Sequence, residues 1–315
     1  MSGCKKSSNP TIPTLTTNSI GNLSFNTATS GGTITSNGGA TIATSGICWS
    51  NSNNMPTIGD SLTKGNTSVG SFNATMNNLQ SNTTYYVRAY ATNSAGTGYG
   101  NVVSFSTTVD TTKVTFTYNG QSVTYGVIVS PTTGRKWMDR NLGASRAATY
   151  ASDSLAYGDL FQWGRLADGH QLRTSDTTSV LSTGDVPSNG DFILTVNAGP
   201  ANDWRSPSND NLWQGSHGIN NPCPSGWHVP FEAEWAAETG VVDSTSGYSQ
   251  LMLTTRSGYR WLDGSFSGSS GGYYWSSSAV SGTGLAYYFR IKPTLSNATT
   301  ATQRGIANSV RCIKD

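Results

Sequence analysis

The stretch from residue 157 to residue 230 constrains this chain most, because it combines aromatic residues, glycines and paired polar residues in a pattern that core-building alone does not require. Rings such as Trp163 and Trp227 stand there beside Gly, Asn and Pro. Such a pattern is typical of a specific domain scaffold. It is concentrated in four clusters, at residues 157–165, 168–170, 211–214 and 221–230.

The composition indicates a β-rich or loop-rich extracellular protein. At 315 residues the chain is long enough for two domains, each with its own core. Only 11% of the residues are charged, against roughly 25% in an average soluble protein, so hydroxyl and amide groups must solvate the surface. Aromatic residues make up 10%, whereas disordered chains are poor in them. We therefore expect disorder only at the ends and in the linker.

The charged residues argue against one class of partner. A formal net charge of +2 and a pI near 8.3 arise from scattered Lys and Arg, not from a basic stripe. Nucleic-acid binding depends on clustered cations that neutralise phosphates, so we expect no nucleic-acid partner. No window approaches the roughly 20 apolar residues that cross a bilayer, so we expect membrane contact only through a lipid anchor.

Residues 11–108 show short runs of alternating apolar and polar residues, separated by Gly, Asn and Ser clusters. This spacing predicts the antiparallel strands of a β-sandwich. Residues 79–93 are similar to the E-to-F corner and F strand of a fibronectin type III domain, with Tyr85 as the corner tyrosine whose hydroxyl bonds back to the preceding loop. Ser81 stands where that family usually has proline. The resemblance implies a spacer without a site of its own.

A polar linker at residues 110–112 ends this domain, and we expect a second domain from 113 to 315. It opens with an alternating segment around Asn119-Gly120, a pair that predicts a hairpin turn. Residues 230–240 predict a helix, with acidic residues early, a terminal glycine, and Phe231 and Trp235 facing the core. Later runs predict strands joined by Gly/Ser loops, at residues 257–264, 271–278 and 285–291.

The four clusters, residues 134–142 and the ending at 309–313 together resemble the Fibrobacter succinogenes major paralogous domain. This is a family of bacterial surface and secreted modules related to the C-type-lectin-like fold. The expected fold class is therefore mainly β, with a fibronectin type III-like sandwich followed by an α+β, C-type-lectin-like domain. The resemblance implies binding rather than catalysis, and no cofactor.

The cysteines are too widely spaced for a CxxC metal or redox site, which leaves a long-range disulfide or buried thiols. In the family resemblance Cys223 and Cys312 are the partners, and the loop that they close would stabilise the domain by roughly 4 kcal/mol. Cys48 is then expected as a small buried residue on a strand.

The last predicted strand has two faces. Period-two alternation puts Leu285, Tyr287, Phe289 and Ile291 on one face, interpreted as core, and Ala286, Tyr288 and Arg290 on the other, interpreted as outward. Aromatic and Arg side chains dominate recognition surfaces because they bury much area at low entropy cost. The alternative is that most of these rings fill a small, loop-rich core. The expected ligand-binding set, placed by the resemblance in the ligand-facing region, is Trp261, Asp263, Phe266, Tyr273, Tyr288 and Arg290.

Other candidate sites have weaker support. The three histidines lack the spacing of a helical zinc site, so we expect turn and packing roles for them. The carboxylates in the loops are expected to cap backbone amides. A calcium site is an alternative, because hard cations prefer oxygen ligands. The residues concerned are His170, His217 and His228 for zinc, Asp159, Asp168 and Asp203 for capping, and Asp203, Asn209, Asp210 and Asn211 for calcium.

An enzyme interpretation has one precedent in this fold, the oxidases that convert a sulfatase cysteine to formylglycine. Those use a pair of reactive cysteines near the C-terminus, whereas here the resemblance assigns Cys223 and Cys312 to structure. We therefore expect no enzymatic activity and no metal.

Residues 1–10 resemble the end of a bacterial lipoprotein signal, in which the lipidated residue would be Cys4, followed by a flexible tether. No apolar signal core precedes Cys4, so either the start lies upstream of Met1 or Cys4 is a free residue in a disordered tail. We expect a recognition or adhesion protein, lipid-anchored on the extracellular face of a Gram-negative outer membrane or secreted. Its ligand would be a saccharide or a protein surface.

Two other functions use the same modules. One is a bacteriophage receptor-binding or virion decoration protein, and the other is an accessory protein that binds plant or host glycan. The C-terminal region also resembles the variable region of proteins diversified by retroelements, since Tyr, Ser, Asn and Thr are abundant in it. The oligomeric state does not follow from the sequence.

Overall fold

The computed structural model describes residues 9–65, 67–199, 201–238, 255–268, 270–292 and 295–315. The chain divides between Thr111 and Thr112 into two compact units, which we call unit 1 and unit 2. Cys4 and most of the expected tether lie outside the described residues. Within the described ranges, no helix is long and apolar enough to cross a bilayer.

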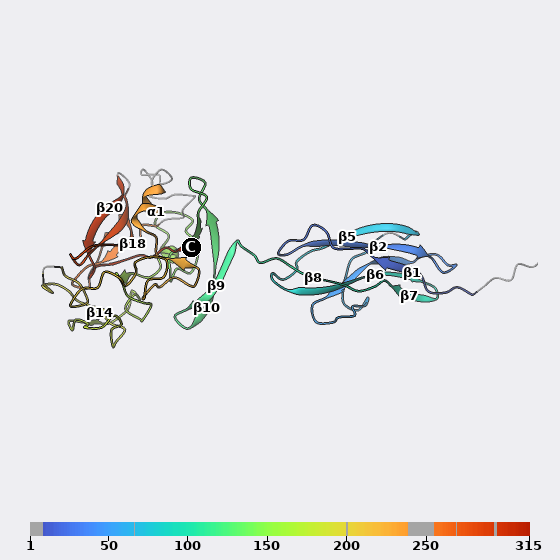
Figure 1. Cartoon of the computed structure of the whole chain (residues 1–315), viewed down its shortest axis with the longest axis horizontal. Helices are drawn as coiled ribbons and strands as arrows, with labels where there is room; N and C mark the ends of the chain where they lie inside the picture. The colour runs from blue at the N-terminus through green and yellow to red at the C-terminus, as the bar shows by residue number, and fades with distance from the viewer. Residues whose placement is uncertain (1–8, 66, 200, 239–254, 269, 293–294) are drawn as a thin grey trace, which may run out of the picture. The chain divides into compact units, whose positions relative to one another are not determined.

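Unit 1 consists of two antiparallel sheets (Figure 1). Apolar residues of both sheets meet between them, among them Ile34, Phe72, Ile47 and Val87. Cys48 lies buried on the third strand with a free thiol, as predicted. One sheet has the order β1 (Thr14–Thr17), β2 (Ala28–Ser36), β5 (Gly70–Met76), and the other has the order β4 (Ser61–Leu62), β3 (Thr44–Ser50), β6 (Thr84–Asn93), β7 (Gly96–Tyr99), with β8 (Val103–Ser106) also paired to β6.

The predicted tyrosine corner is present. The hydroxyl of Tyr85 accepts a hydrogen bond from the backbone N–H of Gln80 at 2.9 Å, and its ring stacks on Phe105 with the ring centroids 5.8 Å apart. This bond ties the loop before β6 to the strand itself. With its strand order and this corner, unit 1 is an immunoglobulin-like or fibronectin type III-like β-sandwich.

The Tyr85→Phe substitution removes only the hydroxyl and should destabilise unit 1 by about 1 kcal/mol, the usual value of one hydrogen bond. Hydrogen exchange measured by mass spectrometry should show faster exchange of the Gln80 amide, which loses its acceptor. Tyr86→Phe is the matched control, because Tyr86 is the half-buried next residue of the same strand. Equal protection of Gln80 in both variants would show that the corner bond is not formed.

Unit 2 opens with the predicted hairpin. Strand β9 (Lys113–Tyr118) pairs with β10 (Gln121–Val129), and Tyr118 lies opposite Gln121, so the turn contains only Asn119 and Gly120. Both turn residues have positive φ, 48° and 73°, as a two-residue turn that matches strand twist requires. The hairpin belongs to a five-stranded sheet with the order β15 (Trp227–His228), β22 (Ile313–Lys314), β11 (Lys136–Met138), β10, β9.

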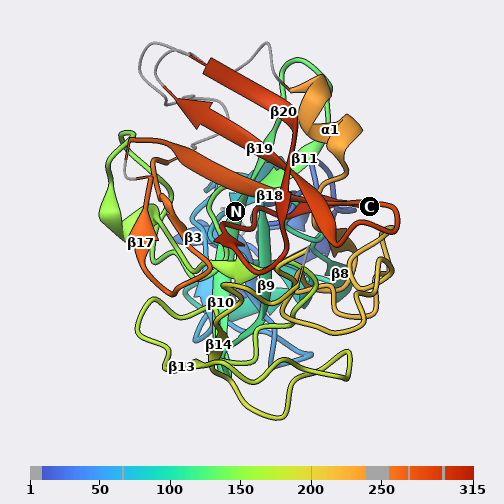
Figure 2. The same cartoon turned by 90° about the vertical axis from the view of Figure 1, so that its left-hand side faces the viewer.

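The other sheets of unit 2 are small, and long loops connect them. The three-stranded sheet carries α1 beside it (Figure 2). A 3₁₀ helix, η1, covers Ser154–Ala156. The sheets are β18 (Gly272–Val280), β19 (Leu285–Lys292), β20 (Leu295–Gln303); β12 (Phe161–Gln162), β21 (Ala307–Asn308), β16 (Tyr259–Arg260), β17 (Phe266–Ser267); and the parallel pair β13 (Thr177–Thr178), β14 (Phe192–Ile193).

The helix α1 (Glu232–Ala237) is shorter at its start than predicted, and residues 239–254 lie outside the described part of the chain. Trp235 faces the core as predicted, since it is buried and stacks on Phe289 at 4.8 Å between ring centroids. The prediction for Phe231 is wrong. This residue precedes the helix, is half-buried, and packs on the ring of His228 at 4.9 Å, because its backbone is extended rather than helical.

The predicted disulfide between Cys223 and Cys312 is present, with the two Cα atoms 5.9 Å apart. It joins the loop before β15 to the residue before β22, which are neighbouring strands of one sheet. The bond therefore secures the residue before β22 to the loop that precedes β15.

Replacing both Cys223 and Cys312 with Ser should lower the free energy of unfolding of unit 2 by roughly 4 kcal/mol, because the unfolded chain regains the entropy of a loop 89 residues long. Guanidinium denaturation followed by tryptophan fluorescence measures this, since every tryptophan except Trp49 lies in unit 2. Cys48→Ala is the control and should leave that transition unchanged. An unchanged midpoint in the double variant would contradict the expectation.

Candidate functional site

A pocket of about 270 Å³ opens in unit 2 beside strands β16, β18, β19 and β21. We call it the aromatic pocket. It brings together four of the six residues predicted as ligand contacts, namely Trp261, Tyr273, Tyr288 and Arg290. The complete lining is Tyr259, Trp261, Tyr273, Tyr288, Arg290, Thr302, Ile306 and Asn308.

The rings of the aromatic pocket form a continuous row. Tyr259 contacts Trp261 at 5.8 Å and Tyr273 at 4.7 Å between ring centroids, and Tyr273 lies 6.0 Å from Tyr288. Strand pairing produces the row, because Tyr273 lies directly opposite Arg290 and their neighbours two residues along share the same face. The pocket thus has walls of packed rings, three of them held by strands and Trp261 by the turn that follows β16.

The predicted outward face of β19 is more buried than expected, which corrects the assignment of its two faces. Tyr288 is only 9% exposed and Tyr273 on the adjacent strand only 6%. Of the face interpreted as core, Phe289 and Ile291 are buried. β19 is the central strand of its sheet, and one face packs against Trp235 while the other packs against the main core cluster. Tyr288 therefore reaches the surface only through the pocket.

The remainder of the predicted core face is also different from expectation. Leu285 and Tyr287 are half-buried rather than buried. They lie toward the start of the strand, before Phe289 and Ile291, the two residues of this face that join the cluster around Trp235.

The structure does not bring Asp263 and Phe266 to this pocket. Asp263 accepts hydrogen bonds from the backbone N–H and the hydroxyl of Ser265, at 2.9 and 2.6 Å, and lines a different hollow. Phe266 is 50% exposed and lies beside the guanidinium groups of Arg173 and Arg260, at 5.9 and 5.4 Å. Both residues are close to Trp261 in the sequence, but the chain turns away from the pocket after Leu262, and no local pattern predicts this turn.

Four lining residues were not predicted from the sequence, namely Tyr259, Thr302, Ile306 and Asn308. Tyr259 adds a ring to the wall, and Asn308 adds a buried amide. Tyr259 stands two positions before Trp261, so period-two alternation offered a signal for it. Asn308 had no local signal. It reaches the pocket because β21 inserts between β12 and β16, strands that come from distant parts of the sequence.

The polar groups of the aromatic pocket are one cation and neutral amides and hydroxyls. Burial raises the pKa of Tyr288, and the positive charge of Arg290 opposes this effect. The hydroxyl of Tyr288 therefore remains protonated at neutral pH. It is available as a hydrogen-bonding group beside the guanidinium.

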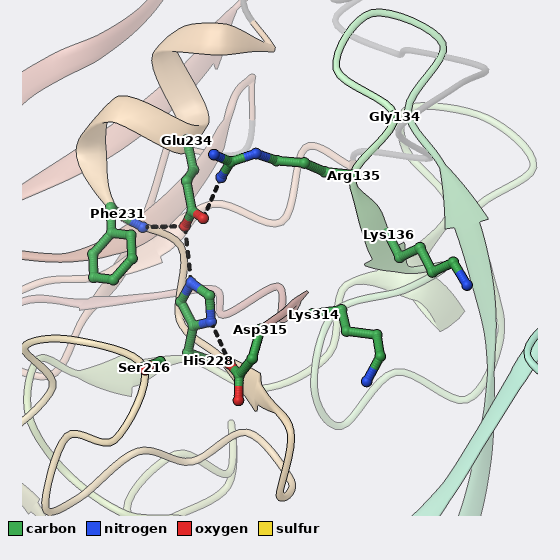
Figure 3. Close-up of a pocket in the computed structure, with 9 residues that line it drawn as sticks. All are labelled: Gly134, Arg135, Lys136, Ser216, His228, Phe231, Glu234, Lys314 and Asp315. Atoms are coloured by element: carbon green, nitrogen blue, oxygen red, sulfur yellow. Dashed lines mark hydrogen bonds and ion pairs between the residues drawn. The ribbon is translucent and has the colours of Figure 1, made fainter.

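A second pocket, of about 530 Å³, contains a row of charged side chains (Figure 3). The ring of His228 bonds through Nδ1 to Asp315 Oδ1 at 2.6 Å and through Nε2 to Glu234 Oε2 at 2.9 Å, and Arg135 pairs with Glu234. Two carboxylates on two ring nitrogens hold His228 as the doubly protonated cation. A general base needs one nitrogen without a proton, so this arrangement fits structure better than catalysis.

The pKa of His228 follows from this geometry. Burial alone would lower it, but the hydrogen bonds to Glu234 and Asp315 and their negative charges outweigh burial, so the pKa is raised. The pKa of Glu234 is lowered, because its bonds to His228 and the backbone of Phe231 outweigh the effect of burial.

A raised folded-state pKa makes the contribution of His228 to stability complete below the unfolded value of about 6.5, and that contribution is lost as pH rises through the folded value. The contribution of His228 to the free energy of unfolding of unit 2 should therefore fall with pH above about 6.5. Guanidinium titrations over that range measure the slope. His170, whose pKa burial lowers to about 4, and Asp159, whose pKa burial raises to about 6, add their own pH dependence at the lower end of this range, so the variants are compared with the wild type. His228→Gln should remove this fall of the free energy of unfolding with pH, whereas substitution of the exposed histidine, His217→Gln, should retain it. The same pH dependence in both variants would refute the assignment.

A second histidine, His170, and the loop carboxylate of Asp159 lie in the interior. Burial lowers the pKa of His170 to about 4, and the neutral ring accepts from the backbone N–H of Gln162 while it bonds to Asp168. Burial raises the pKa of Asp159 to about 6, where it accepts from the hydroxyl of Tyr118 at 2.8 Å. These are packing roles, as predicted for His170. Asp159 binds a side chain and not the backbone amide that was expected.

The alternative calcium site is occupied by a cation of the protein itself. The guanidinium of Arg304 lies 3.7 Å from Asp203 and 2.5 Å from Asp210, and it also donates to the backbone carbonyl of Asn209. One cation of the protein therefore already lies beside both carboxylates, an arrangement that does not favour a calcium ion there.

The three cysteines in the described part of the chain are a disulfide pair and one buried thiol. Cys223 and Cys312 form the disulfide, and burial raises the pKa of Cys48 to about 11. A thiol with so high a pKa is a poor nucleophile at neutral pH.

No family model matches the chain, and neither does any curated protein. Among solved structures the chain is similar to the sensor domain of the anti-sigma factor RsgI4 in Pseudobacteroides cellulosolvens, with 16% identity over 32% of this chain and 98% of that chain and a TM-score of 0.25. It is also similar to the fibronectin type III domain of human fibronectin type III domain containing protein 3, with 20% identity over 34% of this chain and 94% of that chain and a TM-score of 0.23. A third similar structure is the third fibronectin III domain of human KIAA0343 protein, with 13% identity over 35% of this chain and 93% of that chain and a TM-score of 0.22. By its own strand order and tyrosine corner, unit 1 is an immunoglobulin-like or fibronectin type III-like sandwich, and unit 2 has no family assignment.

Proposed function

We propose that this chain is a bacterial surface recognition protein, in which unit 1 is a spacer and unit 2 binds a ligand in the aromatic pocket. The observation that carries the proposal is the convergence of Trp261, Tyr273, Tyr288 and Arg290 on one pocket. Rings and Arg provide apolar area together with hydrogen-bonding groups, which suits a saccharide or a side chain of a protein ligand. Trp261 is 38% exposed, so it is the member of the set that a ligand meets first.

Unit 2 is, in this proposal, a C-type-lectin-like module of the Fibrobacter succinogenes major paralogous type. The motif residues that carry the resemblance support it, as does the disulfide between Cys223 and Cys312. A lipid on Cys4 would place the module on the extracellular face of the outer membrane. The protein would then act in adhesion or recognition, without catalysis.

The first test is an array of immobilised glycans and candidate protein ligands probed with the full chain. Trp261→Ala should reduce the affinity for each bound ligand about tenfold or more, as removal of a central ring does at other binding sites. Tyr288→Phe retains the buried ring and removes one hydroxyl, so it should weaken binding less and preserve the fold.

Phe266→Ala is the matched control, because Phe266 is an exposed ring on the same part of the chain and lies outside the pocket. Its binding should equal that of the wild type. The assignment of the site fails if Trp261→Ala leaves every ligand bound as before, or if Phe266→Ala weakens binding as much as Trp261→Ala.

A further inference from the structure

We infer that the aromatic pocket takes a saccharide that carries a carboxylate, with the sugar ring on the aromatic side chains and the carboxylate on Arg290 and Asn308. This inference rests on the proposed function, because both place the ligand in the same pocket. The further inference specifies the charge of the ligand, which is negative, and the group that carries it, a carboxylate.

Two buried donors in the pocket have no partner. The side-chain nitrogen Nδ2 of Asn308 and the Nε of Arg290 are both inaccessible to solvent and make no hydrogen bond in the described part of the protein. Asn308 is only 1% exposed, so its amide cannot turn to bulk water. A buried donor without an acceptor costs about 1–3 kcal/mol, and a ligand that offers acceptor oxygens would recover this cost.

The charge of the pocket selects the kind of acceptor. Arg290 is the one charged residue among those that line it, and no carboxylate of the described residues forms an ion pair with Arg290. Two of the fully buried arginines differ in this respect, since Arg165 pairs with Asp168 and Arg304 pairs with Asp210. Arg290 is therefore left with an unneutralised charge at the place where ligand would sit.

A carboxylate fits these donors better than the other common acceptor groups do. Its planar pair of oxygens matches the N–H groups of a guanidinium, and charge-assisted bonds of this type are about twice as strong as neutral ones. A phosphate brings close to two negative charges at neutral pH, more than one arginine neutralises. A neutral hydroxyl would satisfy the donors but would leave the charge of Arg290 unpaired.

The walls and the size of the pocket indicate what bears the carboxylate. Tyr259, Trp261, Tyr273 and Tyr288 present ring faces and edges, against which the apolar C–H groups of a sugar can pack. The volume of about 270 Å³ lies at the small end of ligand pockets, which suits one sugar residue rather than a chain. Thr302 and the Tyr288 hydroxyl also line the pocket and can accept hydrogen bonds from sugar hydroxyls.

The test uses the full chain with D-glucuronate, D-galacturonate and N-acetylneuraminate, each in titration calorimetry and NMR, and with D-glucose and D-galactose as neutral counterparts. At least one acidic sugar should bind about tenfold or more tighter than the neutral sugars, which is the value of a hydrogen bond to a charged group. The side-chain amide resonance of Asn308 should shift on binding. Arg290→Gln should remove the preference for the acidic sugars over the neutral ones.

Lys136→Gln is the matched control, since it also removes one positive charge but lies at the second pocket. It should leave the binding of the acidic sugars unchanged. The inference is overturned if no acidic sugar binds, or if glucose or galactose binds as tightly as the acids. In the second case, a loss of neutral-sugar binding in Trp261→Ala would still support the proposed function, so the two failures can be told apart.

Discussion

The interior of unit 2 depends on indole N–H groups that satisfy buried backbone carbonyls of strands and loops. Trp163 donates to the carbonyl of Ser276 at 2.9 Å, Trp275 to that of Phe161 at 2.6 Å, and Trp213 to that of Asn220 at 2.8 Å. A buried carbonyl without a partner costs about 1–3 kcal/mol, and a unit with few long strands has many such groups. Each tryptophan fills core volume and supplies one donor. This dual role explains why the clusters of the sequence are rich in tryptophan.

Buried arginines also donate to backbone carbonyls of unit 2, and they add a positive charge. The guanidinium of Arg304 lies over the ring of Trp163 at 4.3 Å and donates to the backbone carbonyl of Leu285, while Arg311 donates to the side chain of Asn141 at 3.0 and 2.9 Å. A buried charge is tolerated only where partners surround it. These side chains therefore hold distant loops against β19 and β11. The scaffold can be irregular and still be specific.

The aromatic pocket lies at the edge of this hydrogen-bonded interior. Two of its buried donors, on Arg290 and Asn308, have no hydrogen-bond partner among the described residues. Except for Trp261, its ring walls come from β16, β18 and β19, whose positions are determined by strand pairing and by packing on the main core cluster. Side chains held in this way lose little entropy when a ligand binds. The unpaired donors of Arg290 and Asn308 are thus preorganised groups. This is the arrangement on which we base both the proposed function and the choice of an acidic sugar.

Local signals in the sequence determined the elements whose cause is local. The Asn119-Gly120 turn requires positive φ, Tyr85 bonds to a residue five positions earlier, and Trp235 lies on the apolar side of its own helix. The resemblance also supplied the pairing of Cys223 with Cys312. Only the tertiary structure decided which aromatic residues share a pocket. Strand β21 enters between β12 and β16, and β19 is covered on both faces, so Asn308 joins the site, Phe266 is excluded, and Tyr288 is buried. Contacts between residues far apart in the chain leave no periodic trace in the sequence, which is why alternation alone assigned the faces of β19 incorrectly.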